Sequence, residues 1–250
     1  MYRQTLIAAV LTLGLSGCII NVNASGYRAE FLETRQLTLN AAELSALQAE
    51  TGAGDLHIKE VDGLQQIRVT ATIYGKPGME YELTLEQHLH SARLIAKADA
   101  SGRWQNSPYI DLTVEVPVNL NLKVSDGSGD IVISGGQNIN IDDGSGDIHI
   151  TNSHGELEIS DGSGAINILH HTGRISIDDG SGEIRVASVN GDLYIKDGSG
   201  SINTTDVSGN VTIDDGSGDI QISHAGSLNI VEAGSGNLII DGVSNTAGRK

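Results

Sequence analysis

The sequence predicts an all-β protein whose larger part is a right-handed parallel β-solenoid with 18-residue coils. The motif Asp-Gly-Ser-Gly recurs with a first spacing of 17 residues and later spacings of 18, beginning at Asp126, Asp143, Asp161, Asp179, Asp197 and Asp215. Each repeat also carries two stretches in which apolar and polar residues alternate, as in a strand with one buried face. A fixed period of this kind is typical of solenoids.

Each coil is expected to consist of two nine-residue halves, and each half of a short strand and a glycine-bearing corner. Stacking the coils at about 4.8 Å turns each apolar position into a column. One column should contain Ile131, Ile148, Ile166, Ile184, Ile202 and Ile220, extended by Leu238; the opposite wall should contain Leu157, Ile175, Leu193 and Val211. The 250 residues include 1 Trp, 6 Tyr and 1 Phe, so branched aliphatic side chains must build the core. Parallel crossovers of this type are right-handed in most proteins.

Upstream of the regular repeats, residues 31–117 are expected to form a less regular β region. Strand-like alternation occurs at Ile67–Tyr74, Tyr81–Glu86, Arg93–Ala96 and Tyr109–Val116. The segment from Thr51 to Gly63 matches the repeat template more faintly. Residues 118–250 then form the solenoid, and residues 241–250 lose the alternation and become polar, as a cap over an open sheet edge would be.

The amino-terminal residues predict export and lipidation. Residues 1–17 read as a signal peptide, with Arg3 followed by an apolar stretch from Leu6 to Leu15 that is too short for a membrane-spanning helix. Cys18, the only cysteine, directly follows Leu-Ser-Gly, and this resembles the lipobox of bacterial lipoproteins. The alternative is an ordinary signal peptide with a leftover cysteine. In the lipoprotein interpretation, residues 18–30 are the lipidated cysteine and a tether, and the absence of Asp at Ile19 implies the outer membrane.

A family resemblance is carried by the stretch from Ile110 to Ile131 together with the Ser-Gly-Asp-Ile repeats. These residues resemble a bacterial family of β-strand-repeat proteins labelled "putative adhesin", a domain of unknown function. The resemblance covers roughly residues 40–240 and implies a right-handed β-solenoid. It implies no catalytic residue. The regular Asp before each Gly-Ser-Gly departs from many members of the family.

The charge of the chain argues against nucleic-acid binding and leaves cation binding as an alternative. Net charge is −17, whereas nucleic-acid binders present basic surfaces. Residues 126–250 hold 19 acidic and 5 basic side chains. Calcium-binding β-rolls also use Gly- and Asp-rich nonapeptides, but their ligand position is occupied here by isoleucine. We therefore expect the motif aspartates to accept hydrogen bonds from turn amides, which favour the charged form of a carboxyl group. Only outward-facing aspartates then remain as weak cation sites: Asp142, Asp178 and Asp214.

Catalytic and cofactor motifs are not recognisable in the sequence. The histidines match no zinc-site spacing, so we expect them to lie on the surface. The motif serines form a column without a nucleophile elbow. Aromatic residues, which often supply ligand platforms, are concentrated in the less regular region. The candidate ligand surface therefore comprises Tyr74, Tyr81, Trp104 and Tyr109, with core or corner filling as the alternative role.

Together these observations predict a non-enzymatic, lipid-anchored protein of the cell envelope with a structural or adhesive role and no cofactor. Its expected partners are the membrane, through acylated Cys18, and an envelope or extracellular protein or polysaccharide. A calcium- or other cation-binding repeat module is the second hypothesis. A glycan-active β-helix enzyme is the third.

Overall fold

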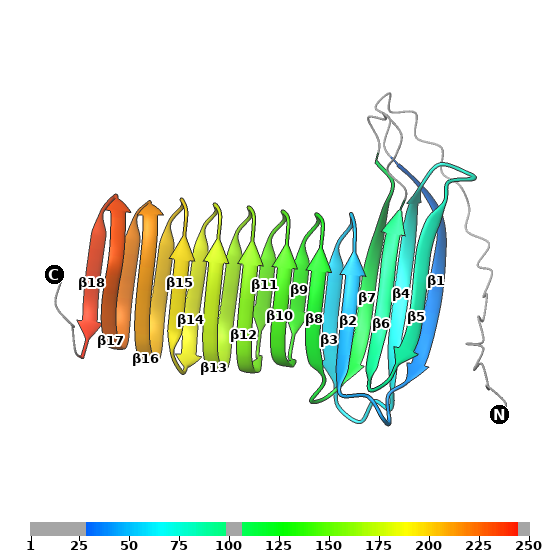
Figure 1. Ribbon diagram of the computed structural model, residues 1–250, viewed down its shortest axis with the longest axis horizontal. Coiled ribbons are helices and arrows are strands. Elements are labelled where there is room, and N and C mark those ends of the chain that lie inside the picture. Colours follow the sequence, from blue (N-terminus) through cyan, green and yellow to red (C-terminus); the bar gives the residue numbers. More distant parts are fainter. Residues whose placement is uncertain (1–28, 99–106, 245–250) are drawn as a thin grey trace.

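The computed structural model describes residues 29–98 and 107–244, which form 18 strands and no helix (Figure 1). No helix of the described ranges is therefore long and apolar enough to cross a membrane. The expected signal peptide, Cys18, most of the expected tether and Trp104 lie outside these ranges. The strands stack along one long axis into a β-solenoid, as the repeat predicts.

The strands of the amino-terminal section are β1 (Glu30–Asn40), β2 (Ala46–Thr51), β3 (Leu56–Val61), β4 (Gln66–Gly75), β5 (Tyr81–His88), β6 (Ser91–Ala98) and β7 (Tyr109–Pro117). The regular coils follow in β8 (Asn121–Asp126), β9 (Ile131–Ser134), β10 (Gln137–Asp143), β11 (Ile148–Thr151), β12 (His154–Asp161) and β13 (Ile166–Asp179). The last strands are β14 (Ile184–Asn190), β15 (Leu193–Asp197), β16 (Ile202–Ser217), β17 (Ile220–Ser235) and β18 (Leu238–Val243).

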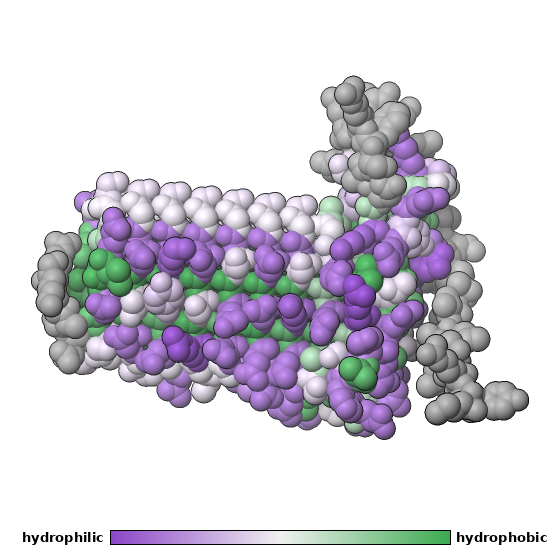
Figure 2. Space-filling model, viewed as in Figure 1, coloured by the Kyte–Doolittle hydropathy of each residue, from purple (hydrophilic) through white to green (hydrophobic). Residues whose placement is uncertain are grey.

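Each regular coil contributes one strand to each of two walls. The strand β13 runs around a corner, so its first half pairs with β14 on one wall and its second half with β15 on the other. Both expected columns are confirmed by the register, with Ile166 beside Ile184 and Ile175 beside Leu193. The side chains of these four residues are at most 1% exposed. The core is therefore a double row of aliphatic side chains, and polar residues run in rows along the outside (Figure 2).

The amino-terminal section does not stack in sequence order. The strands β2 and β3 form one coil that lies between β8–β9 on one side and β6–β7 on the other, paired parallel to both. The faint repeat from Thr51 to Gly63 thus includes part of a true coil. Beyond it, β4 pairs antiparallel with β7 and with β1, and β5 pairs antiparallel with β6. These antiparallel strands close this end of the parallel stack.

Glycine is required at the corners because successive coils approach through their backbones. Gly164 has φ +148°, and a Cβ atom there would lie 1.7 Å from the carbonyl oxygen of Gly146 in the preceding coil. A Cβ atom on Gly162 would lie 2.5 Å from the Gly144 carbonyl oxygen. No other residue fits either distance, which explains why both glycines recur in every copy of the motif.

Candidate functional sites

Three aromatic side chains meet on the outer face of β1, β4 and β7. Tyr74 is the register partner of both Phe31 and Tyr109, so the three residues lie side by side across the strands. The rings of Tyr74 and Tyr109 stack at 4.6 Å with an interplanar angle of 16°, while Phe31 meets Tyr74 edge-on at 6.1 Å. We call these residues the aromatic cluster. Because the tyrosine rings cover each other, Phe31, 59% exposed, offers the most open apolar surface.

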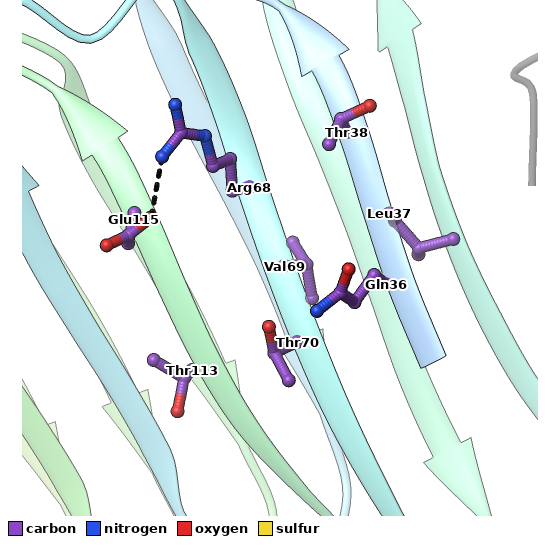
Figure 3. Close-up of a pocket in the computed structure, with 8 residues that line it drawn as sticks. All are labelled: Gln36, Leu37, Thr38, Arg68, Val69, Thr70, Thr113 and Glu115. Carbon is purple, nitrogen blue, oxygen red and sulfur yellow. Dashed lines mark hydrogen bonds and ion pairs between the residues drawn. The ribbon is translucent and has the colours of Figure 1, made fainter. Parts of the chain in front are cut away.

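A shallow polar groove continues along the same face. It has a volume of about 270 Å³ and is lined by Gln36, Leu37, Thr38, Arg68, Val69, Thr70, Thr113 and Glu115 (Figure 3). Arg68, Thr70 and Tyr74 occupy alternate positions of β4, so their side chains lie on the same outward face of the strand. Arg68 Nη1 lies 3.4 Å from Glu115 Oε2, in a half-exposed ion pair. The groove thus offers hydroxyl, amide, guanidinium and carboxylate groups next to exposed aromatic surface.

Tyr81 does not belong to the aromatic cluster. Its hydroxyl donates to Glu33 Oε1 at 2.5 Å, and the Arg35 guanidinium lies 5.9 Å from its ring centre. Glu33 is the register partner of buried Ile73, so this network lies on the opposite face of β1 from the cluster. Hydrogen bonds from Arg35 and Tyr81 lower the pKa of Glu33. The structure therefore brings Tyr74 and Tyr109 together and separates Tyr81 from them. Trp104 lies outside the described residues, and Phe31 was not anticipated from the sequence.

The motif aspartates form a buried row along one corner of the solenoid. We call these residues the aspartate ladder: Asp126, Asp143, Asp161, Asp179, Asp197 and Asp215. Their side chains are 0–8% exposed. In the later coils Oδ1 accepts the backbone N–H of the serine two residues on, at 3.1 Å for Asp179 and Ser181. The expected Asx turns are thus confirmed. The second carboxyl oxygen of Asp179 is buried without a hydrogen-bond partner, as in the other ladder residues.

Burial changes the protonation chemistry of the ladder. From their hydrogen bonds alone we expected the aspartates to favour the charged form. This expectation is wrong, because desolvation outweighs the turn amides and adjacent carboxylates add repulsion. Burial first, and neighbouring ladder aspartates in addition, raise the pKa of Asp161 and Asp179 to about 6. The ladder is therefore a stack of carboxyl groups that gain protons far more readily than exposed aspartates do.

The outward-facing aspartates do not gather into one cation site. The register places Asp142, Asp178 and Asp214 in alternate coils, with Ser160 between the first two and Lys196 between the last two. Lys196 Nζ donates to both carboxylate oxygens of Asp178, at 3.0 and 3.1 Å. Within residues 29–98 and 107–244, no group of three or more His, Cys, Asp or Glu side chains is placed to hold a metal ion.

One histidine departs from the expectation that histidines decorate the surface. His171 is 1% exposed and points into the corner opposite the aspartate ladder. Its Nδ1 lies 2.8 Å from the Ser153 hydroxyl, and its Nε2 lies 3.2 Å from the Gly155 carbonyl oxygen. Burial lowers the pKa of His171. Because Val189 occupies the same position in the next coil, His171 serves as a satisfied core residue.

Comparison with known proteins finds one matching family model and several solved structures of low sequence identity. The family model described as Toastrack DUF4097 matches residues 20–190 and, in a second alignment, residues 80–242. A "putative adhesin" from Parabacteroides merdae is 11% identical, with 88% of this chain and 98% of that chain covered and a TM-score of 0.43. A "putative lipid binding protein" from Parabacteroides distasonis is 12% identical, with 88% and 99% covered and a TM-score of 0.42. A "putative cell adhesion protein" from Clostridium sporogenes is 13% identical, with 84% and 99% covered and a TM-score of 0.36. No curated protein matches the chain.

Proposed function

Because this chain belongs to the Toastrack DUF4097 family and folds as an all-β solenoid, we propose that it is a non-enzymatic binding protein of the bacterial cell envelope. The observation that carries the proposal is the aromatic cluster beside the polar groove. Both lie on the antiparallel strands β1, β4 and β7 at one end of the stack, away from the repetitive coils. A long stack with its distinctive surface at one end suits a structural or adhesive role.

The chemistry of this surface favours a polysaccharide over a protein partner. Phe31 offers an open ring against which an apolar sugar face can pack, and aromatic side chains combine large contact area with a defined geometry. Thr70, Thr113 and Gln36 supply hydrogen-bonding groups at strand spacing, which can follow a chain of hydroxyl groups (Figure 3). The groove is open and shallow, so its ligand is expected to be extended and bound weakly at each unit.

Cosedimentation with deproteinised envelope polysaccharide, containing peptidoglycan and lipopolysaccharide, tests this proposal. A soluble form that begins at residue 19 keeps every described strand and is a suitable reagent. We expect Phe31→Ala to reduce the bound fraction severalfold without lowering the melting temperature, because Phe31 is largely exposed. Tyr194→Ala is the matched control, since Tyr194 is the single aromatic residue of the regular coils. Equal binding by wild type and both variants would rule out the aromatic cluster as the ligand site.

We further propose that Cys18 anchors the chain to the outer membrane. The support is the Leu-Ser-Gly-Cys sequence after the apolar leader, and at least two acyl chains on the cysteine would make the attachment stable. Cys18→Ala should abolish labelling by radioactive palmitate and release the protein from the membrane fraction. A variant that remains in the membrane fraction as wild type does would refute the anchor.

A further inference from the structure

The aspartate ladder leaves a continuous row of oxygen atoms without partners inside one corner of the solenoid. Its residues are register partners from coil to coil, from Asp126 and Asp143 at one end to Asp197 and Asp215 at the other. Each has at least one buried carboxyl oxygen that accepts no hydrogen bond, and Asp143 has two. Buried polar atoms nearly always have a hydrogen-bond partner. A whole column of exceptions therefore points to a donor that the neighbouring side chains do not supply.

Among the described residues, the groups around the ladder leave these oxygens without a donor. The N–H groups of the motif turns are already used by the first carboxyl oxygen, as Ser181 N–H is by Asp179. Lys196 precedes Asp197 in the chain but donates to Asp178 instead. Carboxylates also surround the ladder: Asp55, Asp142, Asp147, Asp178, Asp214 and Glu232. No group in residues 29–98 and 107–244 is placed to hold a metal ion. The remaining donor is a proton on the ladder itself, because a protonated carboxyl group donates one hydrogen bond.

We infer that neighbouring carboxyl groups of the aspartate ladder share protons. In mildly acidic solution alternate residues are protonated, and each donates its O–H to the unpartnered oxygen of the carboxylate in the next coil. Equivalent atoms of adjacent coils lie about 4.8 Å apart, so carboxyl groups aligned with the stack leave about 2.6 Å between facing oxygens. That is the length of a short O–H···O⁻ hydrogen bond. Aspartic proteases likewise hold one proton between two carboxyl groups.

The two ends of the ladder fit this arrangement. At one end, the Thr51 hydroxyl donates to Asp126, so a hydroxyl group supplies the donor from the coil on that side. At the other end, the register partner of Asp215 in the next coil is Ala233, and the row of carboxyl groups stops there. Burial first, and neighbouring carboxylates in addition, raise the pKa of Asp143 and Asp197 to about 6, which agrees with partial protonation in mild acid.

Shared protons make this corner of the solenoid respond to pH. One proton for each neighbouring pair removes the repulsion between two carboxylates and joins two coils through a hydrogen bond. As pH rises through about 6 the protons leave, the hydrogen bonds are lost, and like charges face each other from coil to coil. The titration of this corner involves neither the aromatic cluster nor Cys18, so it is separable from ligand binding and from anchoring.

Nuclear magnetic resonance of the soluble form, labelled with carbon-13 at the aspartate carboxyl carbons, tests the sharing of protons. The ladder carboxyls of wild type should titrate in two steps, because the first proton of a pair makes the second harder to add. Proton spectra at about pH 5.5 should contain strongly downfield signals from the shared O–H···O⁻ protons. These signals should disappear at about pH 8.

Asp179→Asn interrupts the ladder at its middle. It should weaken proton binding by Asp161 and Asp197 at least tenfold, because each then has one carboxyl neighbour fewer and lies beside an amide donor. It should also remove at least one downfield signal, and it should leave proton binding by Asp126 within twofold of wild type. Asp178→Asn is the matched control, because it makes the same change one residue away on the exposed side of the strand. This control should keep every downfield signal.

Three results would overturn the inference. Ladder carboxyls that are fully ionised at about pH 5.5 would show that water, and not a proton, partners the buried oxygens. Protonated carboxyls that titrate in a single step and give no downfield signal would show that each acid is buried separately. Unchanged titration of Asp161 and Asp197 in the Asp179→Asn variant would show that neighbouring coils do not share protons.

Discussion

Replacing Asp179 with asparagine should stabilise the solenoid at neutral pH. Asp179 is 3% exposed and lies between its register partners Asp161 and Asp197 in the aspartate ladder. Asparagine keeps the oxygen that accepts the Ser181 N–H and removes one buried negative charge. Its amide group also supplies donors for neighbouring carboxylate oxygens that have no partner.

The magnitude follows from the raised pKa. Burial and the adjacent carboxylates raise the pKa of Asp179 from 3.8 to about 6. Two pKa units correspond to about 3 kcal/mol, an upper limit on what the buried charge costs at pH 7. A gain of about 1–3 kcal/mol is therefore expected, or roughly 2–12 °C in melting temperature for a chain of this size.

The pH dependence has a definite sign. Because the folded pKa is raised, the native protein holds the proton more tightly than the unfolded chain does. The stabilising contribution is fully present below the unfolded pKa, near 3.9, and is lost as pH rises through about 6. Wild type should therefore lose stability between pH 4.5 and 7.5, and the advantage of Asp179→Asn should fade toward pH 4.5. Buried His171 titrates in the opposite sense, but it is common to both proteins and cancels in the difference.

Urea denaturation at pH 4.5 and pH 7.5 measures these free energies of unfolding. Asp178→Asn is the control, because the neighbouring residue is exposed and its ion pair with Lys196 is worth at most about 1 kcal/mol. The reasoning fails if Asp179→Asn is less stable than wild type at pH 7.5. It also fails if the stability difference between variant and wild type is the same at both pH values.

Three further predictions test the packing and the corners. Ile184→Asp should lower the free energy of unfolding by more than about 4 kcal/mol, because Ile184 is fully buried. Arg185 faces outward, so Arg185→Asp should lower it by less than about 1 kcal/mol. Equal losses of stability in urea denaturation would refute the two-wall core. Gly164→Ala should lower the free energy of unfolding by about 3 kcal/mol or more, because its Cβ atom would overlap the Gly146 carbonyl oxygen. Ser163→Ala is the control and should be nearly neutral; melting temperatures that fall equally in the two variants would contradict the close approach of the coils. Millimolar calcium at matched ionic strength should leave the melting temperature unchanged, and a rise of about ten degrees, more than about 1 kcal/mol, would favour a cation-binding module.

The regular coils were predictable because an 18-residue period fixes which residues share a column. Ile166 and Ile184 stack because they hold the same place in successive repeats. The same alignment could have shown that His171 is buried, since it shares its column with Val189 and Val207. Repeat alignment was sufficient wherever neighbouring coils are neighbours in sequence.

The amino-terminal section was less predictable because its pairing is not periodic. No local pattern indicates that the β2–β3 coil inserts between β7 and β9, or that β1 pairs antiparallel with β4. The aromatic cluster depends on that register, which is why Phe31 was missed and Tyr81 was grouped with it. The charge state of the aspartate ladder was misjudged for a related reason, because desolvation depends on the coils above and below each residue.

Hydrogen–deuterium exchange tests the proposed binding surface most directly. The soluble form would be measured alone and with the deproteinised envelope polysaccharide, and exchange followed by peptide. Binding at the aromatic cluster and groove predicts added protection in peptides from β1, β4 and β7, with the coils from β10 to β16 unchanged. Protection confined to those regular coils, or none at polysaccharide concentrations that saturate cosedimentation, would contradict a binding site on this face.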